Sequence, residues 1–366
     1  MDSMKLEDCC EILDSQRVPI TGSDRTSGDY PYYGANGIQD YVDDFIFDDE
    51  LVLLAEDGGN FGSKTRPIAY RVSGKCWVNN HAHVLKPKAG LDVDYLCYSL
   101  MFYDVGGMVN GATRQKLTQA AMRQMIIPKR SLDEQIEIVN IIKKVQGVIA
   151  SRKEELEQLD LLIKARFVEM FGDININDKN WKYEPLGELC TIVRGGSPRP
   201  IEQFLGGDVP WIKIGDATDG DSIYLNSTKE HIIQEGIKKS RLVKEGSLIF
   251  ANCGVLLGFA RIITFDGCIH DGWLAMEDID ERLDKVFLLQ ALNQMTEHFR
   301  AIAPAGTQPN LNTAIMKAYK QIIPPIELQR EFINFAKQVT KSKVAVQKAL
   351  DETQILFDSL MQEYFG

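Results

Sequence analysis

The sequence lacks the segments that mark membrane and secreted proteins. It has no run of about 18 apolar residues, and residues 1–16 contain no basic segment followed by an apolar stretch. Its seven cysteines are scattered without a CxxC pair, so neither a disulfide framework nor a structural zinc site is indicated. We therefore expect a cytoplasmic protein with free, mostly buried thiols.

Motifs of common active sites are also missing or incomplete. The stretch "GGNFGSKT" (58–65) resembles a phosphate-binding loop, but a serine precedes Lys64 where a glycine is required, so a glycine-rich turn between strands is expected instead. No GxGxxG, GxSxG or [DN]PP[YF] motif occurs, and the adjacent His270 and Asp271 have no accompanying nucleophile motif. We predict no catalytic residue in this chain.

Side chains that could bind a metal ion are few and poorly grouped. "DYVDDFIFDDE" (40–50) includes Asp43 and Asp44, which are typical of a solvated acidic loop beside a strand. His81 and His83 would share one face of a strand, but no third ligand accompanies them. We predict no metal site, although a stand-alone metal-dependent nuclease using these four residues remains an alternative.

Size and charge allow several domains and argue against indiscriminate binding to nucleic acid. A chain of 366 residues that is 44% hydrophobic normally divides into two or more domains. The net charge of -11 disfavours non-specific attraction to phosphates, although it says little about any single surface.

A repeat organises the chain. The closing "MQEYFG" echoes "FVEMFG", which lies 194 positions earlier, and the region between Gln329 and the end matches the region after Gln135 without a gap. Further matched segments precede these regions: "GATRQKLTQAAM" (111–122) with "GTQPNLNTAIM" (306–316), and "IIP" (126–128) with "IIP" (322–324). The protein therefore contains two copies of one structural unit.

Each copy ends in a predicted long helix. Alternate steps of three and four residues from Ile138 and from Phe332 reach apolar side chains at eight of ten positions, with no proline inside either segment. About 38 residues would form a rod roughly 57 Å long. Each stripe alone is typical of a core-facing helix, but two matched stripes favour two helices packed on each other, with the polar Arg152 and Lys343 at unlike positions. The interface positions are Ile138, Ile142, Val145, Ile149, Leu156, Leu159, Ile163, Val339, Val346, Leu350, Phe357 and Leu360.

The regions ahead of the helices contain short β-like runs punctuated by glycine and differ strongly between copies. The helices match between the copies while the globular regions differ. This combination indicates that both copies perform the same structural role on two different targets. We assign two globular domains, each followed by a helix: 1–130, 131–172, 173–325 and 326–366. Because the second helix ends the chain, we expect Phe365 to pack near the start of the first domain.

Glycine-flanked loops in both copies carry side chains suited to DNA. Bases are distinguished by bidentate Arg, Lys, Asn and Gln, while basic and hydroxyl side chains hold phosphates. Any one such loop is more often ordinary surface, and their recurrence in two copies is the stronger signal. The candidates are Tyr32, Tyr33, Asn36, Lys64, Arg66, Arg114, Gln115 and Lys116 in the first copy and Arg194, Ser197, Arg199, Lys213, Asn252, Arg261, Thr307, Gln308 and Asn310 in the second.

The second copy contains three characteristic segments: "YEPLGELCTIVRGGSPRP", then "VPWIKIGD", and "IIPPIELQREFI" before the long helix. With these segments and its two dissimilar globular regions, the chain resembles the specificity (S) subunits of type I restriction-modification systems. The first copy keeps "RQKL", "IIP" and "DEQIEIV" but departs from the GGSP-type opening.

The resemblance implies an α+β fold in which two α/β target recognition domains are separated by an antiparallel coiled coil. Each domain would read one half of a bipartite, asymmetric site in double-stranded DNA, and the coil would set the unread spacer. Two modification (methyltransferase) subunits would supply S-adenosylmethionine and the catalytic residues, restriction subunits would join them, and this chain would hold no cofactor. A coiled-coil interaction scaffold without DNA readout remains an alternative.

Overall fold

The computed structural model shows two compact units of the chain. The first unit is Met1–Arg152 with Ala349–Gly366, and the second unit is Lys153–Lys348. The structure describes residues 2–111, 114–218, 223–254, 256–304 and 310–366. None of the helices in these ranges is long and apolar enough to cross a membrane. All seven cysteines are free thiols, and six of them are buried.

A six-stranded sheet forms the centre of the first unit, in the order β2-β7-β5-β6-β3-β4. The run "LVLLA" at the end of β5 is completely buried because this strand lies in the middle of the sheet with both faces covered. The strands are β2 (Cys10–Ile12), β3 (Ser27–Gly34), β4 (Gly37–Val42), β5 (Phe47–Ala55), β6 (Ala69–Val78) and β7 (Ala82–Pro87).

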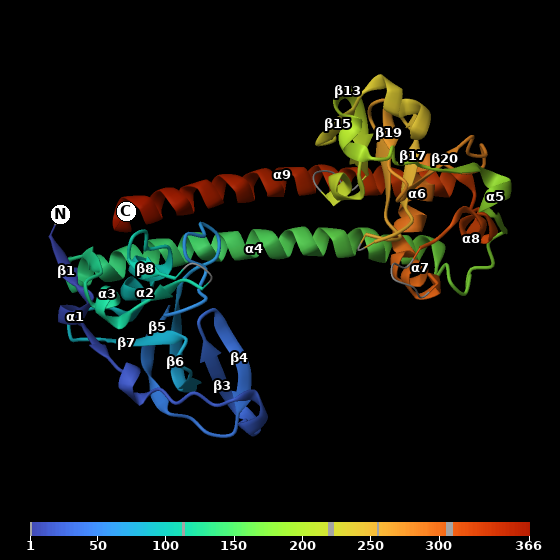
Figure 1. The fold of residues 1–366 in the computed structure, drawn as a ribbon. Helices are drawn as coiled ribbons and strands as arrows, with labels where there is room; N and C mark the ends of the chain where they lie inside the picture. Colours follow the sequence, from blue (N-terminus) through green and yellow to red (C-terminus); the bar gives the residue numbers. More distant parts are fainter. Residues whose placement is uncertain (1, 112–113, 219–222, 255, 305–309) are drawn as a thin grey trace. The chain divides into compact units, whose positions relative to one another are not determined.

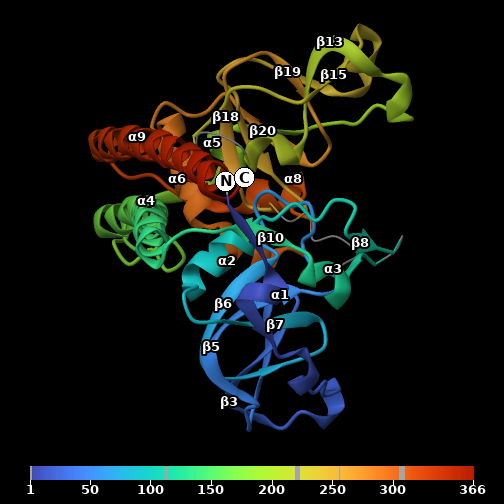
Figure 2. The same cartoon turned by 90° about the vertical axis from the view of Figure 1, so that its left-hand side faces the viewer.

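Helix α2 (Val93–Met101) lies between this sheet and the long helix that follows (Figures 1 and 2). It begins where the Asp92 carboxylate accepts a hydrogen bond from the Tyr95 amide at 2.9 Å, as expected of an N-cap aspartate. The smaller elements of this unit are β1 (Ser3–Lys5), α1 (Leu6–Cys9), η1 (Asp14–Gln16), η2 (Gly22–Asp24), β8 (Val109–Asn110), β9 (Lys116–Leu117), α3 (Gln119–Arg123) and β10 (Ile126–Pro128).

The second unit contains a five-stranded sheet, β12-β20-β17-β18-β14, and a four-stranded sheet, β15-β13-β19-β16. Strands β17 and β18 are buried along their whole length, as "LIFA" and "ARII" suggest. The strands are β12 (Thr191–Arg194), β13 (Leu205–Ile212), β14 (Tyr224–Leu225), β15 (Glu230–Ile232), β16 (Arg241–Val243), β17 (Leu248–Ala251), β18 (Ala260–Ile263), β19 (Gly267–Ile269) and β20 (Trp273–Glu277).

The repeat in the sequence appears again as matched elements. β1 pairs with β10 in the first unit, and β11 (Tyr183–Pro185) pairs with β21 (Lys320–Ile322) in the second. Helix α6 (Lys285–Gln294) matches α2, and its N-cap Asp284 accepts from the Val286 amide at 2.8 Å. The remaining elements of the second unit are α5 (Leu186–Leu189), η3 (Ile201–Gln203), η4 (Ile214–Thr218), η5 (Gln234–Lys239), α7 (Thr296–Ile302) and α8 (Thr313–Ala318).

The two predicted long helices are α4 (Leu132–Phe171) and α9 (Ile326–Phe365). Ser131 and Glu134 form a reciprocal cap at the start of α4, because the Ser131 amide donates to the Glu134 carboxylate at 2.8 Å and the Glu134 amide faces the Ser131 hydroxyl. At the other end, Gly172 has a φ of +78° and donates its amide to Val168 O at 2.8 Å. Glycine suits this position because a left-handed residue closes the helix.

The long helices run antiparallel within each unit. In the second unit the Arg166 guanidinium lies 2.9 Å from Glu331, and Lys343 contacts Asp160. In the first unit Arg152 donates to Ala349 O and to the hydroxyl of Thr353. From Arg166 to Asp160 to Arg152 the residue numbers fall along α4, while the numbers of the residues they contact on α9 rise. The two helices therefore run in opposite directions. The predicted α+β class with an antiparallel pair of helices is confirmed.

All twelve apolar side chains assigned to the helix interface are buried or half-buried in the structure. Arg152 and Lys343, the polar interruptions, each form a contact between the helices, as the bonds above show. Arg152 and Lys343 are at positions that do not correspond in the two copies of the repeat. Their contacts would be lost if the helices shifted along each other, so they restrict the register of α4 and α9.

The end of α9 lies against the first domain (Figure 1). The Phe365 ring centroid is 5.2 Å from that of Tyr95, in an edge-to-face arrangement. The Tyr95 hydroxyl donates to Pro128 O at 3.1 Å, and Pro128 pairs with Ser3 across the β1–β10 ladder. Phe365 thus packs near the start of the first domain, as expected.

Candidate nucleic-acid interface

Three loops of the first unit that carry predicted DNA-binding residues meet one another. Asn36, in the turn between β3 and β4, donates its side-chain amide to Gly58 O at 3.0 Å. Gly58, in the β5–β6 loop, donates its backbone amide to Gln115 O at 3.2 Å. We call residues 36, 57–66 and 114–116 the first loop cluster.

Anchored cations are exposed on this cluster. The Arg114 guanidinium lies 2.6 Å from Asp57, and the Lys116 ammonium lies 2.9 Å from Glu56. Both cationic side chains are about half exposed, at 58% and 49%. Lys64 and Arg66 are exposed on the β5–β6 loop. A cation anchored by one carboxylate keeps donors free for phosphate or base acceptors, which suits either role in DNA binding.

A buried ion-pair network lies beneath the cluster. His83 is fully buried, with Nδ1 2.7 Å from Asp14 Oδ2 and Nε2 2.9 Å from Leu117 O. Each ring nitrogen of His83 therefore lies within hydrogen-bonding distance of a protein oxygen. The Arg17 guanidinium donates to Glu56 at 2.6 Å. The network ties η1, β5 and β7 to the strand that follows Arg114.

Hydrogen bonds stabilise the ionised carboxylates of this network. Burial alone would raise the pKa of Asp14, but the bonds from His83, the Val84 amide and Gln119 outweigh burial and lower that pKa. Burial likewise opposes ionisation of Glu56, while the bonds from Arg17 and Lys116 lower its pKa. Both groups are therefore carboxylates at neutral pH.

The same network contains side chains of the types that bind metal ions. Asp14, Glu56 and His83 form the group of acidic and histidine side chains that the described residues bring close enough to bind one. Both nitrogens of His83 and the oxygens of both carboxylates already have protein partners, and two of these partners are the cations Arg17 and Lys116. This geometry favours an ion-pair network over a metal centre.

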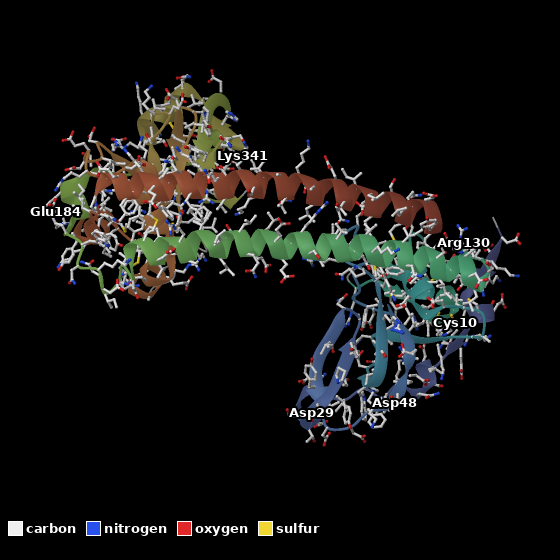
Figure 3. All side chains as sticks on the ribbon, turned by 180° about the vertical axis from the view of Figure 1, so that it is seen from behind. Cys10, Asp29, Asp48, Arg130, Glu184 and Lys341 are labelled. Carbon is white, nitrogen blue, oxygen red and sulfur yellow. The ribbon has the colours of Figure 1, made fainter. Side chains whose placement is uncertain are left out.

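The residues proposed for a metal-dependent nuclease do not come together as that alternative requires. His81 faces Asp57 at 2.7 Å, whereas His83 is buried against Asp14. Asp43 and Asp44 are exposed between β4 and β5 and do not belong to the group above. The nearby Asp29 and Asp48 lie at the end of the sheet that points away from α4 (Figure 3).

One side chain predicted to bind DNA in the first copy is buried. Tyr32 is 1% exposed, its hydroxyl accepts from the Ile20 amide at 3.1 Å, and Arg25 covers its ring at 4.2 Å. It points into the core because side chains alternate along β3, so its ring is covered by protein and this burial disfavours a role in contacting DNA. Its neighbour Tyr33 is half-buried beside Tyr70.

In the second unit, Asp271 gathers the predicted residues of the "RGGSPRP" loop. Arg194 Nε donates to Asp271 O at 3.0 Å, and the Ser197 hydroxyl donates to the Asp271 carboxylate at 2.6 Å. Arg199 is 80% exposed and lies 3.8 Å from the same carboxylate. We call these four residues, with His270 and Trp211, the second loop cluster.

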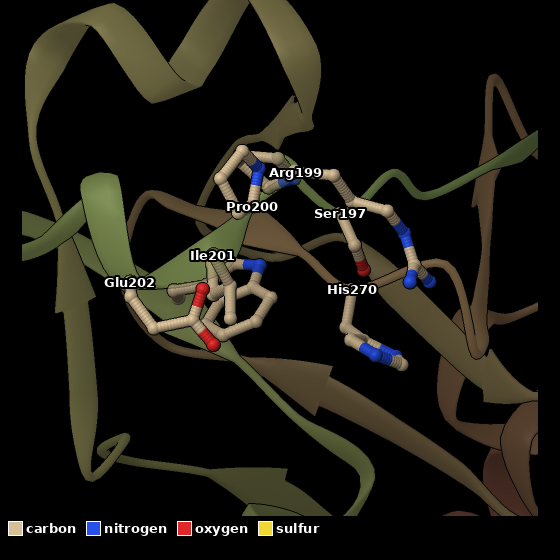
Figure 4. Close-up of a pocket in the computed structure, with 8 residues that line it drawn as sticks. Ser197, Arg199, Pro200, Ile201, Glu202 and His270 are labelled. Atoms are coloured by element: carbon tan, nitrogen blue, oxygen red, sulfur yellow. The ribbon is translucent and has the colours of Figure 1, made fainter.

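A cavity of about 530 Å³ opens in this cluster. Figure 4 shows Ile201 and Glu202 on one side of it and Ser197 and His270 on the other. Its walls combine an aromatic ring, prolines, a guanidinium and a carboxylate, which are groups that stack on and hydrogen-bond to a base. The lining residues are Ser197, Pro198, Arg199, Pro200, Ile201, Glu202, Trp211 and His270.

Local charges set the protonation of this cluster. Burial lowers the pKa of His270, and the surrounding cations reinforce this against the opposing charge of Asp271. Its Nδ1 accepts from the Gly272 amide at 2.9 Å, so Nε2 carries the hydrogen toward Asp271 at 3.0 Å. Burial opposes ionisation of Asp271, but the Ser197 hydroxyl, His270 and Arg199 lower its pKa.

Two side chains predicted to bind DNA in the second copy are buried, which disfavours that role. Asn252 is 0% exposed and donates to the side chain of Asn310 at 3.1 Å. Arg261 is 7% exposed, lies 3.6 Å over the Phe259 ring and donates to Ala260 O at 2.8 Å. Asn310 is half-buried, and the predicted Thr307 and Gln308 lie outside the described residues.

Lys213, another predicted DNA-binding residue, is half-buried: its ammonium contacts Glu230 and lies 5.8 Å from the Trp211 ring.

The carboxylates that hold these loops in place were not identified from the sequence. Asp216, for example, accepts hydrogen bonds from the Lys213 amide and the Thr228 hydroxyl, both at 2.8 Å. The "GD" that follows "WIKI" is the local signal, since aspartate commonly caps a turn after a strand.

An alanine variant tests the first loop cluster. Arg114→Ala should weaken DNA binding about tenfold, and the slope of log affinity against log salt should fall by about 1, if Arg114 neutralises one phosphate. Lys86→Ala is the matched control, because Lys86 also pairs with an aspartate at 2.6 Å. Lys86 is near the end of β7, whereas Arg114 lies beside His81, just before the start of that strand. Equal effects of the two variants would contradict the assignment.

Comparison with known proteins identifies the family. The model of the type I restriction modification DNA specificity domain matches residues 1–161 and 178–353. The chain belongs to this family. A putative type I restriction enzyme specificity subunit from Haemophilus influenzae is 30% identical over 342 residues, which cover 90% of this chain and 85% of that protein. The MjaIX specificity subunit from Methanocaldococcus jannaschii is 23% identical, over 81% of this chain and 74% of its own length.

Two solved structures have a similar fold. The S subunit of a type I restriction-modification system from M. genitalium covers 100% of this chain and 96% of its own, with a TM-score of 0.59 and 14% identity. A chain from a structural study of type I complex assembly gives a TM-score of 0.62 at 16% identity and covers 100% and 97%. The chain is thus a non-catalytic specificity subunit, and catalysis in type I systems belongs to its partner subunits.

Proposed function

We propose that the two globular regions read different halves of one bipartite, asymmetric DNA site. The observation that supports this proposal is that the strand pairs and long helices occur twice, whereas the two loop clusters differ. The elements that lead into and out of each region match, as β1–β10 and β11–β21 do. The loops differ: the first cluster presents Arg114 and Lys116, while the second surrounds a cavity with Arg199 and Trp211.

The antiparallel helices would set the length of the unread spacer and dock two methyltransferase subunits, one for each copy of the repeat. Those subunits would hold S-adenosylmethionine and methylate the DNA, and restriction subunits would join the complex. The net charge of -11 is compatible with this assembly because partner subunits can enclose the DNA and contribute positive charge.

Domain exchange tests the proposal. Residues 1–130 are replaced by the corresponding region of another specificity subunit, the chain is co-expressed with its methyltransferase subunits, and methylated bases are mapped across a host genome. The expected result is a bipartite motif in which one half changes and the other half is retained. Exchange of residues 173–325 is the reciprocal control and should change the other half.

Two outcomes contradict the proposal. If either exchange alters both halves, the domains do not read separately. If the wild-type complex shows no sequence preference on any DNA, the coiled-coil scaffold without DNA readout is the better description.

A further inference from the structure

Two buried glutamines occupy equivalent positions at the start of the long helices. Gln135 in α4 is 1% exposed and Gln329 in α9 is 0% exposed. They are separated by 194 residues, the spacing of the repeat. Glutamine is seldom buried this completely without a partner for each polar group.

Every partner of Gln135 is a backbone group. Its Oε1 accepts from the Asp92 amide at 2.8 Å, and its Nε2 donates to Gly90 O and Arg130 O, both at 3.0 Å. Gly90 O and Arg130 O can only accept hydrogen bonds, so they must face the Nε2 group of Gln135. The backbone amide of Asp92 can only donate, so it must face Oε1, and the orientation of the side-chain amide is determined.

Gln329 repeats this arrangement in the second unit. Its Oε1 accepts from the Asp284 amide at 2.9 Å. Its Nε2 donates to Arg282 O at 2.8 Å and to Pro324 O at 2.7 Å. The same three bonds therefore join the same three segments: the long helix, the chain just before it, and the loop that leads into α2 or α6.

The glutamines act where each recognition region joins its long helix. Asp92 and Asp284 are the N-caps of α2 and α6, the helices that connect sheet and long helix in their units. One aromatic contact is repeated at these joints as well: the rings of Tyr95 and Phe365 meet at 5.2 Å in the first unit, and those of Phe287 and Phe171 at 4.9 Å in the second. The ion pair of Lys143 with Asp94 at 2.6 Å is not repeated, since Val286 stands at the position of Asp94 in the second unit.

We propose that Gln135 and Gln329 are positioning residues that set the orientation of each recognition region on its long helix. Apolar side chains can slide against each other at small cost, whereas three buried hydrogen bonds to backbone hold only within a narrow range of distance and angle. The inference rests on the proposed function, because the orientation of each reader then determines which spacer lengths allow both half-sites to be read.

The test uses Gln135→Met and Gln329→Met in the subunit co-expressed with its methyltransferase subunits. Methylation is measured on a plasmid library that contains the native half-sites with spacers from two base pairs shorter to two longer. Each variant should lose about tenfold in discrimination between the native spacer and spacers one base pair away, as expected for loss of interactions of hydrogen-bond strength. Base preference within the half-sites should be retained. A purely structural role would lower methylation at all spacers alike.

Gln158→Met is the matched control, since Gln158 is exposed on α4, and it should leave spacer selectivity unchanged. Amide hydrogen exchange of the wild-type complex gives a second measurement in case the variants do not fold. The Asp92 and Asp284 amides should exchange as slowly as those of β5, and fast exchange at both would overturn the inference. Unaltered spacer selectivity in folded variants would also overturn it. A wild-type complex without a bipartite motif would instead overturn the proposed function.

Discussion

Replacing Phe332 with alanine should lower the free energy of unfolding of the second unit by about 3–5 kcal/mol, the usual range for removing a buried phenylalanine. Phe332 is 0% exposed, and its ring lies 5.3 Å from that of Phe167 and 5.6 Å from that of Phe171, both edge-to-face. The ring of Phe287 in α6 stacks on Phe167 at 5.9 Å. Residues of α4, α6 and α9 thus share this cluster, and the cavity left by the ring would face all three helices.

Urea unfolding followed by tryptophan fluorescence measures the effect, because Trp181, Trp211 and Trp273 all belong to the second unit. Val344→Ala is the control, since Val344 is on the same helix but 62% exposed. Its cost should stay within about 0.5 kcal/mol, as for surface substitutions in general. Equal costs for the two variants would show that the aromatic cluster does not hold these helices together.

Replacing Asp14 with asparagine should destabilise the first unit by about 3–5 kcal/mol at pH 7, because it removes one partner from a buried ion-pair network. Asp14 is 8% exposed and accepts from His83, the Val84 amide at 2.9 Å and Gln119 at 2.9 Å. Without the charge of Asp14, His83 and Arg17 lose a neighbouring carboxylate. The strand after Arg114 is held by the same network, so DNA binding should weaken as well.

This network also predicts a dependence of stability on pH. The pKa of Asp14 in the folded chain lies below its ordinary value of 3.8, and that of Glu56 below 4.5. A carboxylate whose pKa is lowered by folding stabilises the fold above its unfolded pKa and loses that contribution as pH falls through the folded pKa. The wild type should therefore lose stability below about pH 4, and Asp14→Asn should show a shallower decline.

Chemical unfolding between pH 3 and pH 7 measures both effects. Asp49→Asn is the control, because Asp49 pairs with Lys86 at 2.6 Å with its side chain 38% exposed, and exposed pairs contribute about 0–1 kcal/mol. An Asp14→Asn variant with the stability and the pH profile of the wild type would contradict the role given to the network.

The long helices could be predicted because their signals are local or repeated. An apolar stripe along one helix needs only neighbouring residues to be recognised, and the match at 194 positions shows that the stripe occurs twice. Ile142 and Phe357, chosen on this basis, are 0% and 6% exposed. Arg152 could also be identified as a polar interruption, although its partners on α9 could not.

The candidate interface was predicted less well because exposure depends on distant segments. Tyr32, Asn252 and Arg261 lie near glycines, as loop residues often do, yet the folded chain buries them. Asp57 and Asp271 carry no distinctive motif, but each anchors an arginine of a recognition loop. Whether a strand residue points inward follows from pairing register, which one strand does not reveal.

The sequence by itself determined the two copies, the two long helices and the family, since periodicity, repetition and motif order are properties of the chain. Only the tertiary structure decided which loops meet, which polar side chains are buried, and that Gln135 and Gln329 hold equivalent joints. The physical reason is that a hydrogen bond or an ion pair between segments far apart in sequence requires partners that only the folded chain brings within bonding distance.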